Sequence, residues 1–108
     1  MSQLAGKKCI PCSGGVPPLK SEEIERLKGE VPEWDIVGGH HLSRQYRFPD
    51  FLQTQEFVNK VGAVAEAEGH HPNITFTYGQ ARIDIWTHKI DGLTESDFIL
   101  AAKIDQLT

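Results

Sequence analysis

Two adjacent histidines, His70 and His71, stand in the segment EAEGHHP, which runs from Glu66 to Pro72. An unperturbed imidazole has a pKa of about 6.5, so it can donate or accept a proton near neutral pH. Glu66 precedes His70 by four residues, close enough on a helical turn to fix a ring's tautomer or to stabilise its cation. The residue types therefore indicate an acid/base site. A metal site of imidazoles and Glu66, or a polar loop without a ligand, would use the same residues.

A long helix is expected to place this pair. Asp50 can cap its N-terminus, and Gly69 fits the position just after its last turn. Pro72 follows shortly, so the backbone must become irregular at the two histidines and can turn both rings toward one concavity. The apolar spacing that predicts the helix is carried by Phe51, Thr54, Val58, Val61 and Ala65.

A third histidine, His88, follows a predicted strand. By strand parity it shares a side with Asp84 and Trp86, opposite Ile83 and Ile85. We therefore expect His88 to be reachable by a ligand or by another subunit.

Three further aromatic or imidazole features have two interpretations each. Trp34 and Trp86 suit either a core or interface position, or an apolar wall against a flat heteroaromatic ligand. The pair His40-His41 follows Gly38-Gly39, which indicates a solvated hairpin turn, with ligand contact as the alternative.

The remaining pattern predicts a complete small fold. A short helix begins at Ser21 as N-cap and ends near Gly29, and a capping box of Thr94 with Asp97 opens a last helix. Alternating residues predict two hairpins, one around Gly38-Gly39 and one with a Gly79-Gln80 turn. The order α-ββ-α-ββ-α indicates an α+β fold, in which a four-stranded antiparallel sheet carries three helices on one face and leaves the other open.

Length and composition limit the domain count and the classes of function. The 108 residues suit a single domain, which we place at residues 21–108 after a Pro/Gly-rich arm at residues 1–20. A net charge of −4 argues against direct binding of nucleic acid. No apolar run approaches the length of a membrane span, and the N-terminus lacks a secretory h-region, so we expect a cytoplasmic protein. Cys9 and Cys12 have the spacing of a redox pair or half a zinc site, but an incidental role in the arm fits as well.

The spacing of these residues resembles the signature of the pterin-4a-carbinolamine dehydratases, also called 4a-hydroxytetrahydrobiopterin dehydratases. All positions of that signature are filled, and the likeness extends over roughly residues 20 to 107. The matching positions are Glu66, His70, His71, Pro72, Tyr78, His88 and Asp97.

The resemblance implies a reaction and its residues. The substrate would be the 4a-hydroxytetrahydropterin left by an aromatic amino acid hydroxylase, dehydrated to the quinonoid dihydropterin without metal or added cofactor. His70 and His88 would act as acid and base in an order left open, with His71 orienting the substrate. Glu66, Trp34, Pro72 and Thr87 would bind substrate or support the histidines.

The resemblance also implies homodimers that pair into homotetramers. Two alternatives to this activity stay open at this point. Animal relatives double as dimerisation cofactors of a transcription factor, so the chain could be a protein-binding module. It could also act on a different pterin.

Overall fold

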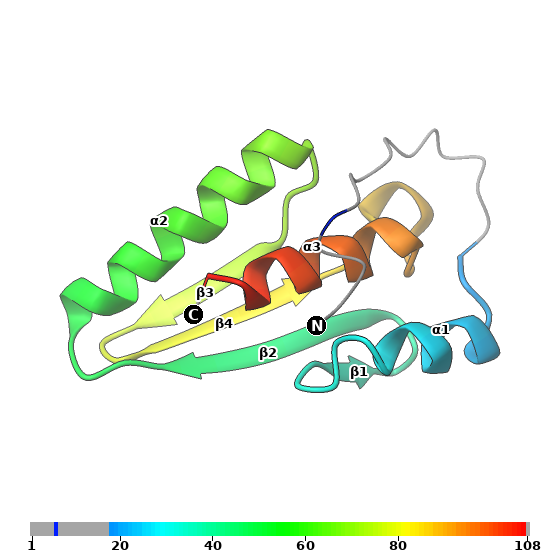
Figure 1. The fold of residues 1–108 in the computed structure, drawn as a ribbon, viewed down its shortest axis with the longest axis horizontal. Helices are drawn as coiled ribbons and strands as arrows, with labels where there is room; N and C mark the ends of the chain where they lie inside the picture. Colours follow the sequence, from blue (N-terminus) through cyan, green and yellow to red (C-terminus); the bar gives the residue numbers. More distant parts are fainter. Residues whose placement is uncertain (1–5, 7–17, 108) are drawn as a thin grey trace.

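Three helices cover one face of a four-stranded antiparallel sheet in the computed structural model, which describes Gly6 and residues 18–107 (Figure 1). The predicted α+β fold is therefore confirmed for these residues. Cys9 and Cys12 lie outside them. The elements are α1 (Ser21–Lys28), β1 (Asp35–Val37), β2 (His41–Arg47), α2 (Phe51–Glu68), β3 (Asn73–Thr77), β4 (Gln80–Ile85), the short 3₁₀ helix η2 (His88–Ile90) and α3 (Glu95–Asp105).

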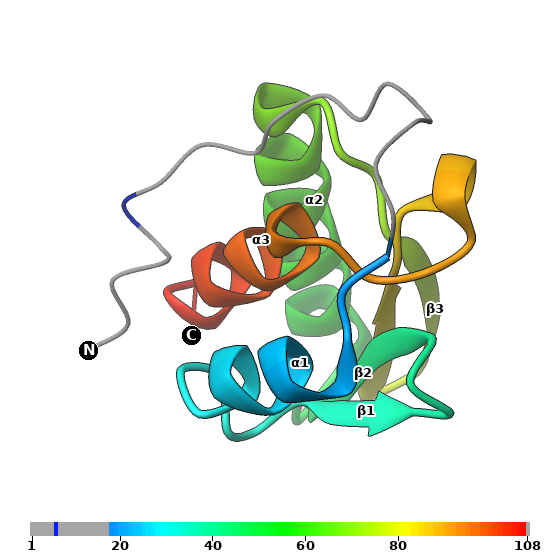
Figure 2. The ribbon, with the colours of Figure 1, turned by 90° about the vertical axis from the view of Figure 1, so that its right-hand side faces the viewer.

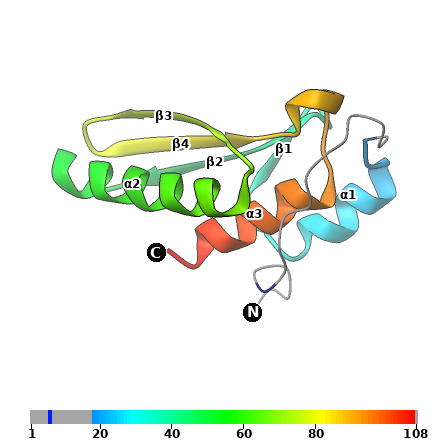
Figure 3. The ribbon, with the colours of Figure 1, turned by 90° about the horizontal axis from the view of Figure 1, so that it is seen from above.

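The sheet has the strand order β1-β2-β4-β3, so β1 and β3 form its edges. Seen from above, the sheet and the helices form two separate layers (Figure 3). Viewed from the end, α3 lies between α1 and α2 (Figure 2). Because side chains alternate along a strand, one sheet face contacts the helices and the other stays open. The largest fully buried side chains include Trp34, Leu42, Ile83, Ile85 and Phe98.

The helix ends mostly follow the sequence. Asp50 caps α2 by accepting a hydrogen bond from the backbone N–H of Gln53 at 2.8 Å. Gly69 ends α2 with φ +64°, a left-handed conformation that glycine adopts at little cost. The predicted capping box of Thr94 and Asp97 is present at α3.

The start of α1 and the second turn each differ by one residue from the prediction. Lys20, with extended backbone angles, is the N-cap, and Ser21 is the first helical residue. The Glu23 carboxylate accepts the Lys20 backbone N–H at 3.2 Å, which satisfies that donor one residue earlier than expected. The second hairpin turns at Tyr78-Gly79, so Gln80 already belongs to β4.

β4 ends at Ile85, before His88. The expectation that His88 continues the strand, with its side set by strand parity, is therefore wrong. The last ladder pair of β4 joins Ile85 to Leu42. Beyond it, Thr87 pairs with Gly92 through backbone hydrogen bonds, which closes a turn and places His88 at the start of η2. His88 is nevertheless exposed, as predicted.

Within the described residues, none of the helices combines the length and the apolar character that crossing a bilayer requires.

Candidate active site

A cleft of about 290 Å³ lies where the loop after α2 meets the segment that leads into η2. The structure brings the three predicted catalytic histidines to this one cleft, although 17 positions separate His71 from His88. The side chains that line it include His70, His71, Trp86, Thr87 and His88.

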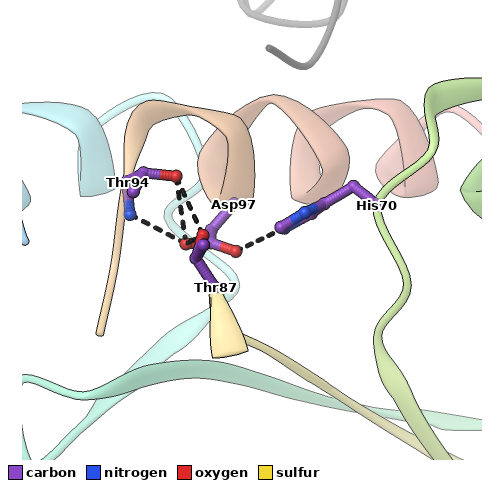
Figure 4. Close-up of polar contacts among 4 residues, drawn as sticks. All are labelled: His70, Thr87, Thr94 and Asp97. Carbon is purple, nitrogen blue, oxygen red and sulfur yellow. Dashed lines mark hydrogen bonds and ion pairs between the residues drawn. The ribbon is translucent and has the colours of Figure 1, made fainter. Parts of the chain in front are cut away.

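His70 is held by a buried carboxylate on α3. Its Nε2 lies 2.5 Å from Oδ1 of Asp97, whose side chain has no exposed surface (Figure 4). Oδ2 of Asp97 accepts the Thr87 hydroxyl at 2.9 Å and the Thr94 backbone N–H at 2.8 Å. The carboxylate therefore caps α3 with one oxygen and holds His70 with the other.

This contact decides which nitrogen of His70 is basic. A carboxylate can only accept hydrogen bonds, so Nε2 carries the proton that it donates to Asp97. In the neutral ring the lone pair is then on Nδ1, and a carboxylate partner stabilises the cation that forms when Nδ1 takes up a proton. With 15% of its side chain exposed, His70 is accessible from the cleft yet fixed in orientation.

His71 has a much more exposed partner. Its Nε2 lies 2.5 Å from Oε1 of Glu66, on the last turn of α2, and the two side chains are 60% and 79% exposed. Glu66 therefore contacts an imidazole, as expected, but it is the ring of His71. Such a solvated pair contributes little to stability, typically about 0 to 1 kcal/mol.

His88 is oriented by an aromatic contact. Its ring stacks on Trp86, with centroids 4.3 Å apart and an interplanar angle of 27°. Trp86 in turn contacts His40 and His41, at centroid distances of 5.4 and 5.6 Å. His40 also binds Asp91, directly after η2, through an Nε2–Oδ1 contact of 2.7 Å. The turn between β1 and β2 therefore packs against the segment that carries His88, and the His40-His41 pair is half-buried there.

Trp34, the residue predicted as a wall of the pocket, does not line the cleft. Trp34 is fully buried, and its Nε1–H donates to Oδ1 of Asp105 at 2.8 Å. Neither Trp34 nor Pro72 belongs to the cleft lining, whereas Trp86 does. Thr87, the remaining supporting residue of the prediction, both lines the cleft and binds Asp97.

Two contributors were not assigned a role in the site from the sequence. Asp97 was named as a helix cap and as a position of the family signature, but nothing in local spacing indicates that its second oxygen meets an imidazole 27 residues away. Trp86 was one of two tryptophans that suited a pocket wall, and only Trp34 was chosen as a site residue. Among residues 18–107 and Gly6, no group of three or more His, Cys, Asp and Glu side chains could hold a metal ion.

Comparison with known proteins adds to this geometry. Residues 17–107 match the family described as "Pterin 4 alpha carbinolamine dehydratase". A protein of Rubrobacter xylanophilus named "Putative pterin-4-alpha-carbinolamine dehydratase" is 58% identical over 107 residues, which cover 99% of this chain and all of that protein.

Two solved structures are similar as well. The "transcriptional coactivator/pterin dehydratase" of Brucella melitensis superposes with a TM-score of 0.77 at 25% identity, covering 83% of this chain and 97% of that one. A pterin dehydratase-like protein identified as a RuBisCO assembly factor in the alpha-carboxysome has a TM-score of 0.60 at 27% identity, covering 69% and 88%.

Proposed function

Because the chain belongs to the pterin 4 alpha carbinolamine dehydratase family, we propose that it dehydrates 4a-hydroxytetrahydrobiopterin to quinonoid dihydrobiopterin. In this elimination the bond from C4a to the hydroxyl oxygen breaks and N5 loses its proton. A double bond forms between N5 and C4a, and the hydroxyl leaves as water. The reaction needs one proton donor and one proton acceptor, and no electrons are exchanged.

The observation that carries this proposal is the pairing of His70 with Asp97 in the same cleft as His88. Two imidazoles that come from different segments can approach a bound pterin from different sides. One of them has a buried carboxylate behind it, and the other is exposed and stacked on an indole. The two rings therefore differ in surroundings, as the two halves of an acid/base pair should.

We assign the base to His70 and the acid to His88. Nδ1 of His70 takes the N5 proton, because Asp97 both orients the ring and stabilises the imidazolium. His88 delivers a proton to the departing hydroxyl and regains one from water, to which it is exposed. His71 orients the substrate by hydrogen bonding. Acid/base catalysis of this kind typically accelerates a reaction about 10² to 10⁴-fold.

We also propose the source of the substrate, the fate of the product and the oligomeric state. An aromatic amino acid hydroxylase supplies the substrate and a reductase consumes the product in the cytoplasm. The pterin is the substrate, and neither metal nor cofactor takes part. The chain acts as a homodimer or homotetramer.

The test follows absorbance of the quinonoid product from freshly generated 4a-hydroxytetrahydrobiopterin. Wild type is compared with His70→Ala, His88→Ala and the spontaneous rate, with and without a chelator. Gln45→Ala, at an exposed position of the sheet, is the control. We expect acceleration that survives chelation, is lost in either histidine variant and is retained in the control. Folded wild type that gives only the spontaneous rate would refute the proposal and leave partner binding or another pterin as the function.

A further inference from the structure

The short helix η2 begins with His88, the proposed acid, and its backbone hydrogen bonds are local. Thr87 pairs with Gly92, and the amides of Ile90 and Asp91 donate to the carbonyls of Thr87 and His88. These bonds fix the shape of the turn. They do not fix its position against the rest of the domain, which depends on side-chain contacts with other segments.

One such contact joins η2 to the hairpin turn between β1 and β2. Oδ1 of Asp91, directly after η2, lies 2.7 Å from Nε2 of His40. A carboxylate only accepts hydrogen bonds, so Nε2 of His40 carries the hydrogen. The backbone of His40 is itself held in the hairpin, because its N–H donates to the Val37 carbonyl at 2.9 Å. His40 therefore links a turn that the sheet fixes to the turn that carries His88.

The ring of His40 is oriented on its other side by His41. The two Nδ1 atoms lie 3.1 Å apart, a contact that needs one hydrogen between them and has no room for two. Because His40 bears its hydrogen on Nε2, the shared hydrogen of the neutral pair belongs to Nδ1 of His41. Both rings also pack on Trp86, at centroid distances of 5.4 and 5.6 Å. These neighbours hold the His40 ring, so binding Asp91 costs little further side-chain entropy.

Asp91 occupies a backbone position that glycine usually fills. Its φ of +51° and ψ of +48° are left-handed, and among the residues that the structure describes no other non-glycine residue has a positive φ. Aspartate and asparagine tolerate this conformation better than most residues with a side chain. A carboxylate that stands at a costly backbone position and reaches His40 indicates a use for that side chain.

We propose that His40 and Asp91 are positioning residues for the dehydration, which hold η2 so that His88 stays stacked on Trp86 at the cleft. The proposal rests on the function proposed above, because it concerns the placement of the acid of that reaction. The Asp91 side chain is 85% exposed, so water competes for the bond. Its effect on the population of the correctly placed turn is therefore modest, about fivefold.

Charge would be a different explanation for a role of Asp91. A carboxylate close to η2 stabilises a cationic His88 without holding the turn. The two explanations differ in the result of Asp91→Asn. The amide oxygen of asparagine accepts the His40 hydrogen as the carboxylate does, but it carries no charge.

The test compares Asp91→Gly with Asp91→Asn. Asp91→Gly removes the acceptor but suits the left-handed backbone, so it should denature at nearly the same urea concentration as wild type. Its kcat should fall about fivefold with little change in KM, which a merely structural role would not produce. Asp91→Asn keeps the hydrogen bond, so its kcat should stay within about twofold of wild type.

His40→Phe tests the other half of the contact. It keeps an aromatic ring against Trp86 but cannot donate to Asp91, so its kcat should fall as in Asp91→Gly. The double variant should fall no further than either single variant, because the same bond is lost in all three. NMR of the histidine rings adds a measurement that needs no turnover. The His88 resonances should shift in Asp91→Gly and stay near their wild-type positions in Asp91→Asn.

Equal losses of kcat in Asp91→Gly and Asp91→Asn would assign the effect to charge and overturn the proposal. Wild-type kcat in Asp91→Gly, or losses that add in the double variant, would overturn it as well. Wild type that gives only the spontaneous rate would refute the dehydration, and the NMR comparison then decides about the contact. A shift of the His88 resonances in Asp91→Gly alone would leave the contact established without the reaction, whereas unmoved resonances would refute both proposals.

Discussion

His70 and Asp97 are joined by a 2.5 Å contact between Nε2 and Oδ1, although 27 positions separate them in the chain. The carboxylate that holds the imidazole also begins α3, because its other oxygen accepts the Thr94 backbone N–H. The Asp97 side chain therefore both caps α3 and orients the candidate base, His70. A change at Asp97 should affect both stability and chemistry, and the two effects can be separated.

Replacing Asp97 by asparagine should lower kcat by about 10², since a neutral amide no longer stabilises the His70 cation. Thr94→Ala removes the hydroxyl half of the capping box and leaves the His70 contact, so it should cost about 1 kcal/mol of unfolding free energy with kcat within about twofold of wild type. Steady-state kinetics and urea denaturation of both variants make the comparison. A similar loss of kcat in the two variants would mean that Asp97 acts only through stability.

The Trp86 side chain should orient His88. Without the indole face, the exposed ring can rotate, so Trp86→Leu is expected to lower kcat about tenfold. Stacking at 4.3 Å also predicts that the indole ring current moves the His88 ring protons upfield. NMR spectra of histidine-labelled wild type and Trp86→Leu measure this directly. Unchanged His88 resonances in the variant would contradict the positioning role.

The pair of Glu66 with His71 should matter little for the fold. Both side chains are more than half exposed, and solvated ion pairs contribute about 0 to 1 kcal/mol. Glu66→Gln is therefore expected to change the unfolding free energy by less than about 0.5 kcal/mol. It should change kcat/KM by no more than about threefold, against a loss of about 10² or more for His70→Ala. A loss of kcat/KM in Glu66→Gln as large as that in His70→Ala would contradict this prediction. It would mean that the exposed pair contributes as much to catalysis as the buried pair.

Tyr46 should make stability fall at alkaline pH. Burial raises the pKa of its phenol well above the ordinary value of 10.0, and the Asp105 carboxylate raises it further, while Arg44 opposes both. The unfolded chain loses this proton near pH 10, whereas the folded protein keeps it. The contribution is therefore fully present below about pH 10, and above it the unfolding free energy should fall by up to about 1.4 kcal/mol per pH unit.

Urea denaturation between pH 8 and 11 checks this slope. Tyr46→Phe should flatten it, because phenylalanine has no proton to lose. Tyr78→Phe, a change at a residue that is 68% exposed, should retain it. Equal slopes in the two variants would show that other groups cause the alkaline loss.

Much of the fold could be predicted because its signals are local. Apolar residues two positions apart in 41–47 and 80–85 must share a sheet face, and those three or four apart in 51–68 must share a helix face. Asp50 and Gly69 end α2 for reasons contained in their own backbone and side-chain chemistry. The exposure of His88 was predicted, but its place on a strand was wrong, because β4 ends at Ile85 and the Thr87–Gly92 pairing leads into η2.

The sequence by itself determined the α+β architecture, the family and the three histidines, because spacing and residue type carry that information. Only the tertiary structure decided their partners. It placed Asp97 against His70 by packing α3 beside the end of α2, buried Trp34 in the core and left Trp86 in the cleft. These outcomes depend on which segments pack together in space, and contacts between distant segments leave no periodic trace along a chain.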